Sequence, residues 1–204
     1  MHQNILNKDQ INLLPIIHEF SNEYYLVGGT AIALQLGHRR SIDFDLFHNG
    51  KIRFRQISNT FQKMGLPISD IVCATEENFT FIINDVNFTF FDYPYDIAHK
   101  IVFDQYISMP SLLDLGAMKA FAMGKRSKWK DYVDMYFLLQ RYSLNDISNR
   151  SSELFKAMFN KKLFRAQLKY FDDLNYDETV NYCVEPIPEE RIKYFLSGVS
   201  TDPF

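Results

Sequence analysis

The chain has 204 residues, of which 47% are hydrophobic and 16% aromatic. This length suits one domain, or one domain with a small helical addition, and the composition excludes an intrinsically disordered chain. The formal net charge of −3 excludes a uniformly basic nucleic-acid-binding surface, so any contact with RNA would need a local basic patch.

The cysteine content and the hydropathy indicate a reducing, aqueous compartment. Cys73 and Cys183 are too few for a disulfide framework or a zinc site. The chain opens with no signal-peptide pattern, and no apolar run approaches membrane-spanning length. We therefore expect a cytoplasmic protein without a membrane partner.

The first predicted elements are a helix and a short buried strand. Apolar residues at helical spacing predict an amphipathic helix over residues 8–22, which Pro15 is expected to kink or split. The apolar run at residues 24–27 predicts a strand, and Gly28-Gly29 predicts the tight turn that leaves it. Thr30 is expected to cap a second helix, which runs to Leu36.

The next predicted strand, residues 42–47, carries two aspartates one residue apart. Strand alternation places Asp43 and Asp45 on one face, opposite an apolar face of Ile42, Phe44 and Leu46. Two neighbouring carboxylates repel each other, and a cation between them removes that repulsion; hard oxygen ligands suit Mg²⁺ or Mn²⁺. The turn before a helix N-terminus attracts phosphate, so the two features together fit nucleotidyl transfer from an NTP.

Each of these features also has an ordinary structural interpretation. Gly28 and Gly29 can form a turn that merely needs positive φ. Asp43 and Asp45 can belong to a solvated strand face, and the basic residues 38–40 to a solvated loop. Only the combination, in this order and spacing, favours a catalytic site.

The stretch GGTAIALQLGHRRSIDFDLF resembles the signature of the AbiEii/AbiGii-type nucleotidyltransferase toxins. That family belongs to the DNA polymerase β-like minimal nucleotidyltransferase superfamily, whose pattern is a Gly-Gly or Gly-Ser turn followed by Asp-x-Asp on the next strand. The resemblance implies metal binding by Asp43 and Asp45. It also implies phosphate or nucleotide contacts, or loop support, from Gly28, Gly29, Thr30, His38, Arg39 and Ser41.

Further strands are predicted at residues 68–74, 79–83 and 86–91, after a helix over 54–64. Asn84-Asp85 predicts the hairpin turn between the last two strands. In the superfamily a third acidic residue often comes from a neighbouring strand, and Asp92 is the candidate for that metal ligand. The alternative for Asp92 is a loop-capping role before Pro94, and Asp85 is the weaker choice of ligand.

After two short strands, at 101–103 and 106–109, two apolar helices are predicted at 111–124 and 131–142. Lys119 and Asp131 lie on them, and Arg126 lies in the basic junction between them. Lys119 must snorkel, pair with an acid or meet a ligand's negative charge. The family resemblance implies that the lysine contacts nucleotide phosphate and that Asp131 helps build the site. The structural alternative is a buried salt bridge between the two helices.

We therefore predict an α/β (α+β) fold with a mixed nucleotidyltransferase-like sheet over residues 1–110 and a helical part over residues 111–204. The expected reaction moves an NMP from an NTP to a hydroxyl of RNA, including tRNA, or of protein. The resemblance implies a toxin of a toxin–antitoxin or abortive-infection pair, controlled by a separate antitoxin protein. The alternatives are a non-catalytic nucleotide-binding or antitoxin-docking module and, as a weaker option, a phosphohydrolase.

Overall fold

The structure is a computed structural model that describes residues 1–201; residues 202–204, the end of the expected helical part, lie outside the described residues. The chain divides into two compact units. The sheet unit comprises Met1–Gln35 and Ser41–Ser111, and the helical unit comprises Leu36–Arg40 and Leu112–Phe204. The short segment Leu36–Arg40 thus belongs by its contacts to the helical unit, although both of its neighbours in sequence belong to the sheet unit.

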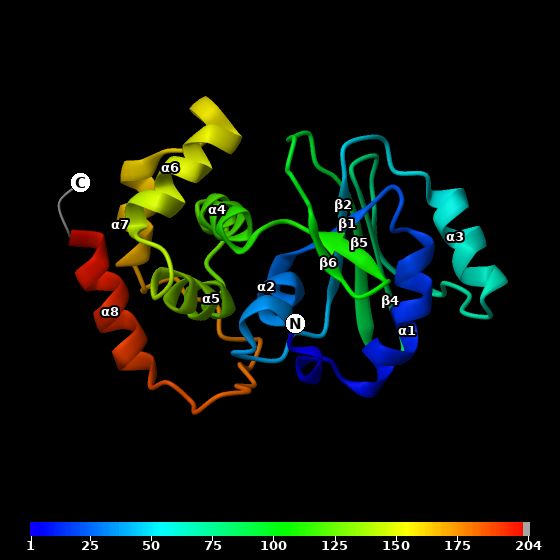
Figure 1. The fold of residues 1–204 in the computed structure, drawn as a ribbon, viewed down its shortest axis with the longest axis horizontal. Coiled ribbons are helices and arrows are strands. Elements are labelled where there is room, and N and C mark those ends of the chain that lie inside the picture. Colours follow the sequence, from blue (N-terminus) through cyan, green and yellow to red (C-terminus); the bar gives the residue numbers. More distant parts are fainter. Residues whose placement is uncertain (202–204) are drawn as a thin grey trace. The chain divides into compact units, whose positions relative to one another are not determined.

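The sheet unit contains a five-stranded mixed sheet (Figure 1). Its strand order is β1 (Tyr25–Val27), β2 (Phe44–His48), β5 (Val86–Asp92), β4 (Asn78–Ile83) and β3 (Asp70–Ala74). The β2–β5 pair is parallel and the other pairs are antiparallel. A separate two-stranded sheet pairs β6 (Ile101–Phe103) with β7 (Ile107–Met109). The predicted mixed α/β architecture is confirmed.

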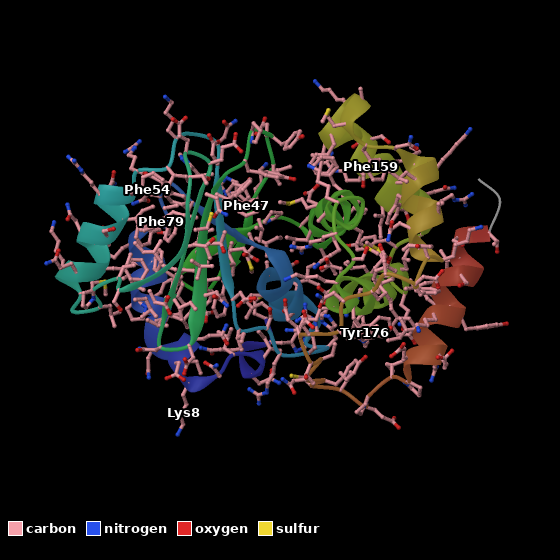
Figure 2. The ribbon with its side chains drawn as sticks, turned by 180° about the vertical axis from the view of Figure 1, so that it is seen from behind. Lys8, Phe47, Phe54, Phe79, Phe159 and Tyr176 are labelled. Carbon is pink, nitrogen blue, oxygen red and sulfur yellow. The ribbon has the colours of Figure 1, made fainter. Side chains whose placement is uncertain are left out.

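Helices cover both faces of the sheet (Figure 1). α1 (Lys8–Glu19) and α3 (Phe54–Lys63) lie on one side, and α2 (Gly28–Leu36) lies on the other. The α1/α3 side is built from aromatic rings, among them Phe61 of α3 in edge-to-face contact with Phe81 and Phe88. Figure 2 shows Phe54 of α3 beside Phe79 of β4, with ring centroids 5.1 Å apart. Because this aromatic layer is buried and strand side chains alternate, the polar residues of the strands lie on the opposite face of the sheet.

The hairpin between β4 and β5 turns at Asn84-Asp85, as the sequence predicts. Both residues have positive φ, 50° and 59° respectively, which is the geometry of a tight two-residue hairpin turn. This turn fixes the antiparallel register of β4 and β5 and therefore the face on which each β5 side chain lies.

Three local expectations were wrong. α1 continues through Pro15, because the exposed proline ring faces solvent while the residues around it are buried and hold the helix in place. α2 begins at Gly28, before Thr30, so Thr30 lies inside the helix and is not its cap. β2 begins at Phe44, and Ile42 is 42% exposed because it precedes the strand alternation that buries Phe44 and Leu46.

The helical unit contains α4 (Leu112–Met123), α5 (Trp129–Leu139), α6 (Leu144–Phe155), α7 (Lys161–Leu168) and α8 (Glu189–Thr201). α4 packs against α5, α6 and α7, and it is buried on nearly all sides, as its apolar sequence predicts. α5 begins and ends before the predicted boundaries. None of the helices within residues 1–201 combines the length and the hydropathy needed to cross a membrane.

Candidate active site

The predicted turn and the predicted aspartate pair meet in the sheet unit at Gly28 and Asp45. The antiparallel register of β1 and β2 places Val27 opposite Asp45, so the chain enters α2 directly beside this carboxylate. Gly28 has φ +70°, and a Cβ atom at this position would lie only 2.0 Å from Asp45 Oδ2. Glycine is therefore required at residue 28 for two reasons, the backbone conformation and the close approach of the carboxylate.

Gly29 and Thr30 complete the first turn of α2, whose backbone N–H groups have no partner within the helix. Such a helix start attracts negative charge, and the Asp45 carboxylate at Gly28 already occupies part of that region. The Thr30 side chain is buried, and its hydroxyl donates a hydrogen bond to the backbone oxygen of Asp43. Thr30 thus fixes the start of β2 against α2, and it is the backbone of this turn that can meet a ligand.

Asp43 lies immediately before β2 and contacts the neighbouring parallel strand. The Nδ2 atom of Asn87 in β5 donates a hydrogen bond of 2.9 Å to Asp43 Oδ1. Within β5, Asn87 and Thr89 alternate with the buried Val86, Phe88 and Phe90, and Thr89 lies opposite Asp45. Asp43, Asp45, Asn87 and Thr89 form one surface of the sheet, which we call the polar face.

Asp92, the predicted third metal ligand, is not part of the polar face. Parallel pairing places Asp92 opposite His48, three residues beyond Asp45, which is about 10 Å along the strand. Asp92 Oδ1 instead accepts a 3.0 Å hydrogen bond from the backbone N–H of Gly50. This is the loop-stabilising alternative that the sequence left open.

Ser41 and Gln10 form a local contact that supports the chain ahead of Asp43. The backbone oxygen of the buried Ser41 accepts a 2.8 Å hydrogen bond from Gln10 Nε2 of α1. Gln10 is itself fully buried and belongs to the capping box that begins α1. Ser41 therefore joins its segment to α1 through its backbone oxygen.

The helical unit contains a second cluster, which we call the ion network: His38, Arg39, Lys119, Arg126, Asp131 and Asp134. Asp134 is fully buried and lies at its centre. Its two carboxylate oxygens accept hydrogen bonds from Arg39 Nε at 2.6 Å and Arg39 Nη2 at 2.8 Å. Lys119 Nζ lies 2.9 Å from Asp134 Oδ2, and His38 Nε2 donates to Oδ1 at 2.8 Å.

Asp131, one turn earlier on α5, forms the other half of the ion network. Lys119 Nζ lies 2.7 Å from Asp131 Oδ1, so this single ammonium bridges both aspartates. Arg126 donates to Asp131 from Nε at 2.8 Å and from Nη2 at 3.2 Å. Lys119 and Asp131 are almost completely buried, whereas the Arg126 side chain is 49% exposed. Arg126 is therefore the member of this half that a ligand can reach.

These contacts determine the charges of the buried groups. Burial opposes ionisation of Asp134, but Arg39 and Lys119 outweigh it and hold the pKa of this carboxyl well below its usual range. Burial would likewise lower the pKa of Lys119, yet Asp131 and Asp134 raise it. The two carboxylates and the Arg39 and Lys119 cations are therefore charged at neutral pH, and the buried Asp131 and Asp134 have their counter-charges within the ion network. This geometry supports the salt-bridge interpretation of Lys119, the alternative that the sequence left open.

His38 behaves differently from the other members of the ion network. Burial lowers its pKa, although the hydrogen bond to Asp134 raises it, so the imidazole is neutral at pH 7. Its Nδ1 atom is buried without a hydrogen-bond partner among the described residues. The backbone around His38 pairs with residues 181–183, through Cys183 N to His38 O at 2.9 Å and Arg40 N to Asn181 O at 2.8 Å. His38 and Arg39 are thus held by both their side chains and their backbone.

The polar face offers two carboxylates, Asp43 and Asp45, as ligands for a divalent cation. Among residues 1–201, no group of three or more His, Cys, Asp or Glu side chains is placed to hold a metal ion. Mg²⁺ is commonly bound by only one or two protein carboxylates and completes its octahedron with water and substrate phosphates. Asp43 and Asp45 therefore fit an ion that arrives with a triphosphate, and they do not fit an all-protein cage.

Comparison with known proteins supports the fold assignment. No protein-family model matches the chain. An uncharacterized protein of Aquifex aeolicus (strain VF5) is 28% identical over 182 residues, which are 87% of each chain. The structure is similar to MenT4, a nucleotidyltransferase toxin of Mycobacterium tuberculosis, with a TM-score of 0.63 at 10% identity over 94% of this chain and 81% of that one.

Two further solved structures are similar. A candidate nucleotidyltransferase of Helicobacter pylori matches with a TM-score of 0.58 at 17% identity, over 95% of this chain and 94% of that one. The antibiotic-resistance factor ANT(2'')-Ia matches with a TM-score of 0.52 at 13% identity, over 71% of this chain and 90% of that one. The chain therefore has a nucleotidyltransferase-like fold.

Proposed function

We propose that the chain is a divalent-metal-dependent nucleotidyltransferase, which moves an NMP from an NTP to an acceptor hydroxyl. The observation that carries the proposal is the meeting of Gly28 and Asp45, with Asp43 beside them on the polar face. A glycine-led helix start next to two carboxylates joins a phosphate-binding backbone to a pair of cation ligands. The nucleotidyltransferase-like fold supports the same assignment.

In this proposal the two aspartates of the polar face and the first residues of α2 have separate tasks. Asp43 and Asp45 hold Mg²⁺ or Mn²⁺, which when bound neutralises charge on the triphosphate and lowers the pKa of the attacking hydroxyl. The N–H groups of Gly28 and Gly29 bind phosphate oxygens, and Thr30 keeps the start of β2 in place through its bond to Asp43.

The proposed reaction is a single displacement at the α-phosphorus of the NTP. The acceptor oxygen forms a bond to this phosphorus, the bond from the α-phosphorus to the α,β-bridging oxygen breaks, and pyrophosphate leaves with that electron pair. The acceptor's proton passes to one of the two aspartates and then to solvent.

For the helical unit we propose an indirect role for most of the ion network. Arg126 offers its half-exposed guanidinium to phosphate, and Asp131 orients it through two hydrogen bonds. Lys119 balances Asp131 and Asp134 and so keeps Asp131 in place. His38 and Arg39 hold their own segment against Asp134, and we assign them no contact with nucleotide.

The proposal also covers the class of acceptor and the biological role of the protein. The toxin description of MenT4 and the family resemblance of residues 38–47 favour a toxin that modifies RNA, including tRNA, or protein in the cytoplasm, with a separate antitoxin. Expression of the chain in a bacterial host is then expected to arrest growth. The Asp43→Asn variant, at equal expression, is expected to leave growth unaffected.

The direct test is nucleotidyl labelling in vitro. Purified protein is incubated with each α-³²P-labelled NTP in turn, Mg²⁺ and total cellular RNA, and label is followed in both RNA and protein. We expect label from one or more NTPs, with at least about a 100-fold loss in Asp43→Asn and in Asp45→Asn. Asp92→Asn is the matched control, because it makes the same change on the neighbouring strand about 10 Å from the polar face.

The outcomes separate the competing functions. Equal loss in Asp92→Asn and Asp43→Asn would contradict the assignment of the polar face. Release of free phosphate or NMP without labelled macromolecule would identify a phosphohydrolase. Nucleotide binding without any turnover would identify a non-catalytic binding or docking module.

A further inference from the structure

Asn87 is a residue of the polar face that has no task in the proposed binding of metal and phosphate. It belongs to β5, the strand directly beside β2, and its amide Nδ2 lies 2.9 Å from Asp43 Oδ1. The register, with Phe44 opposite Phe88, places Asp43 and Asn87 at the same level of the sheet. The carboxamide is thus a group of the adjacent strand in direct contact with one of the two predicted metal ligands.

A carboxamide at this position has two properties that a carboxylate lacks. It is neutral, so it adds no repulsion to the two aspartates, and it can donate a hydrogen bond to one of them. A metal-free polar face with Asn87 is therefore stabilised by a hydrogen bond, where a third carboxylate would add a like charge at the same level. The cost is a lower negative charge for holding a cation, because the affinity of oxygen sites increases with ligand charge.

We propose that, because of Asn87, the polar face binds a divalent cation together with the triphosphate of the NTP. It binds the cation alone only weakly. Asn87 positions the Asp43 carboxylate, one of the two groups that would hold the cation, through its hydrogen bond to Oδ1. The missing charge is supplied by the phosphates of the incoming NTP. This inference rests on the proposed function of the polar face, which it refines by assigning the order and the source of the metal.

The test measures binding of Mn²⁺ by the protein without nucleotide. The electron paramagnetic resonance signal of free aqueous Mn²⁺ is followed as MnCl₂ is titrated into wild type, Asn87→Asp and Asn78→Asp. Asn78 lies on the same side of the sheet in β4, with its side chain beside that of Thr80, and the register places it about 13 Å along the strands from the level of Asn87. The two variants therefore add the same charge to the same sheet surface, at and away from Asp43.

We expect wild type and Asn78→Asp to bind Mn²⁺ weakly, with Kd values near or above about 1 mM. Asn87→Asp is expected to bind at least about tenfold more tightly, because three carboxylates then surround the ion. In the double variant Asp43→Asn/Asn87→Asp the number of carboxylates returns to two, and the gain is expected to disappear. If Asn87→Asp does not fold by circular dichroism, Thr89→Asp, opposite Asp45, takes its place.

A gain of less than about twofold in the folded Asn87 variant, or an equal gain in Asn78→Asp, would overturn the inference. Tight binding of Mn²⁺ by wild type without nucleotide would overturn it as well. Because no nucleotide is present, the outcome is independent of whether the labelling experiment finds nucleotidyl transfer. Failure of the inference and failure of the proposed function can therefore be told apart.

Discussion

The two pairs of neighbouring aspartates in this chain have opposite environments. Asp131 and Asp134 in the helical unit are buried, and Lys119, Arg39 and Arg126 contact them at 2.6 to 3.2 Å. Asp43 in the sheet unit is only partly buried and accepts a hydrogen bond from a neutral amide. One pair thus has its cations built into the fold, whereas the other is suited to a cation that comes from solution. The same residue type serves stability in one unit and is proposed to serve chemistry in the other.

The comparison is tested most strongly by removing the central carboxylate of the ion network. Asp134→Asn leaves Arg39 and Lys119 buried with one counter-charge fewer, and we expect a loss of about 3 to 5 kcal/mol in the free energy of unfolding. Urea denaturation measures this loss. Glu153→Gln is the control, since its side chain is 64% exposed, and its pairing with Arg150 is worth about 1 kcal/mol at most. Equal effects of the two substitutions would contradict the structural role of Asp134.

The close approach at Gly28 is tested by a pair of glycine substitutions. Gly28→Ala and Gly65→Ala both place alanine at positive φ, +70° and +75°, which costs about 1 to 2 kcal/mol. Only the Gly28 variant adds a methyl group 2.0 Å from Asp45, and we expect a further loss of about 1 to 3 kcal/mol in unfolding free energy. Apart from Gly65 itself and its two chain neighbours, no heavy atom of residues 1–201 lies within 4 Å of where an alanine Cβ at this position would be. The same loss in both variants would show that Asp45 does not lie against α2.

How much of this could be read from the sequence depends on how local each feature is. Gly28, Asp43 and Asp45 lie within 18 positions of one another, so turn chemistry and strand alternation were enough to identify them. The prediction that Thr30 caps α2 was wrong, because the helix already begins at Gly28. These errors are small, and they leave the predicted turn and aspartate pair unchanged.

Features that depend on strand register and helix packing could not be derived in the same way. The position of Asp92 could not be foreseen, because it depends on the parallel pairing that places Asp92 opposite His48, three residues beyond Asp45. Asn87 was missed, although its alternation with Phe88 and Phe90 already placed it on the polar face. The central position of Asp134 required the segment around Arg39 to pack against α5, which is a contact across 95 residues.

The pH dependence of the unfolding free energy distinguishes His38 from the charged members of the ion network. Burial lowers the pKa of His38 from its ordinary value of 6.5, so below that pH the unfolded chain binds a proton that the folded chain does not. The stability that His38 contributes is therefore full above about pH 7 and decreases as the pH falls. We expect unfolding free energy to depend less on pH between about 5 and 7 in His38→Asn than in wild type. An unchanged pH dependence would mean that the pKa of His38 is the same in the folded and the unfolded protein.

The smallest expected effect is that of Asp43→Asn on stability without metal. The substitution removes one of two neighbouring charges and keeps an oxygen that can accept from Asn87, so we expect a change within about 0.5 kcal/mol. The same urea denaturation used for Asp134→Asn measures it, in buffer containing EDTA. A loss as large as that of Asp134→Asn would erase the distinction between the two aspartate pairs.

The measurement that tests the central claim most directly is the thermal stability of the protein with each of the four NTPs, with and without Mg²⁺. The account predicts a rise in Tm that needs both Mg²⁺ and nucleotide in wild type and that is absent in Asp43→Asn. A rise that persists in EDTA, or that is undiminished in Asp43→Asn, would contradict the claim that the polar face takes its cation and its triphosphate together.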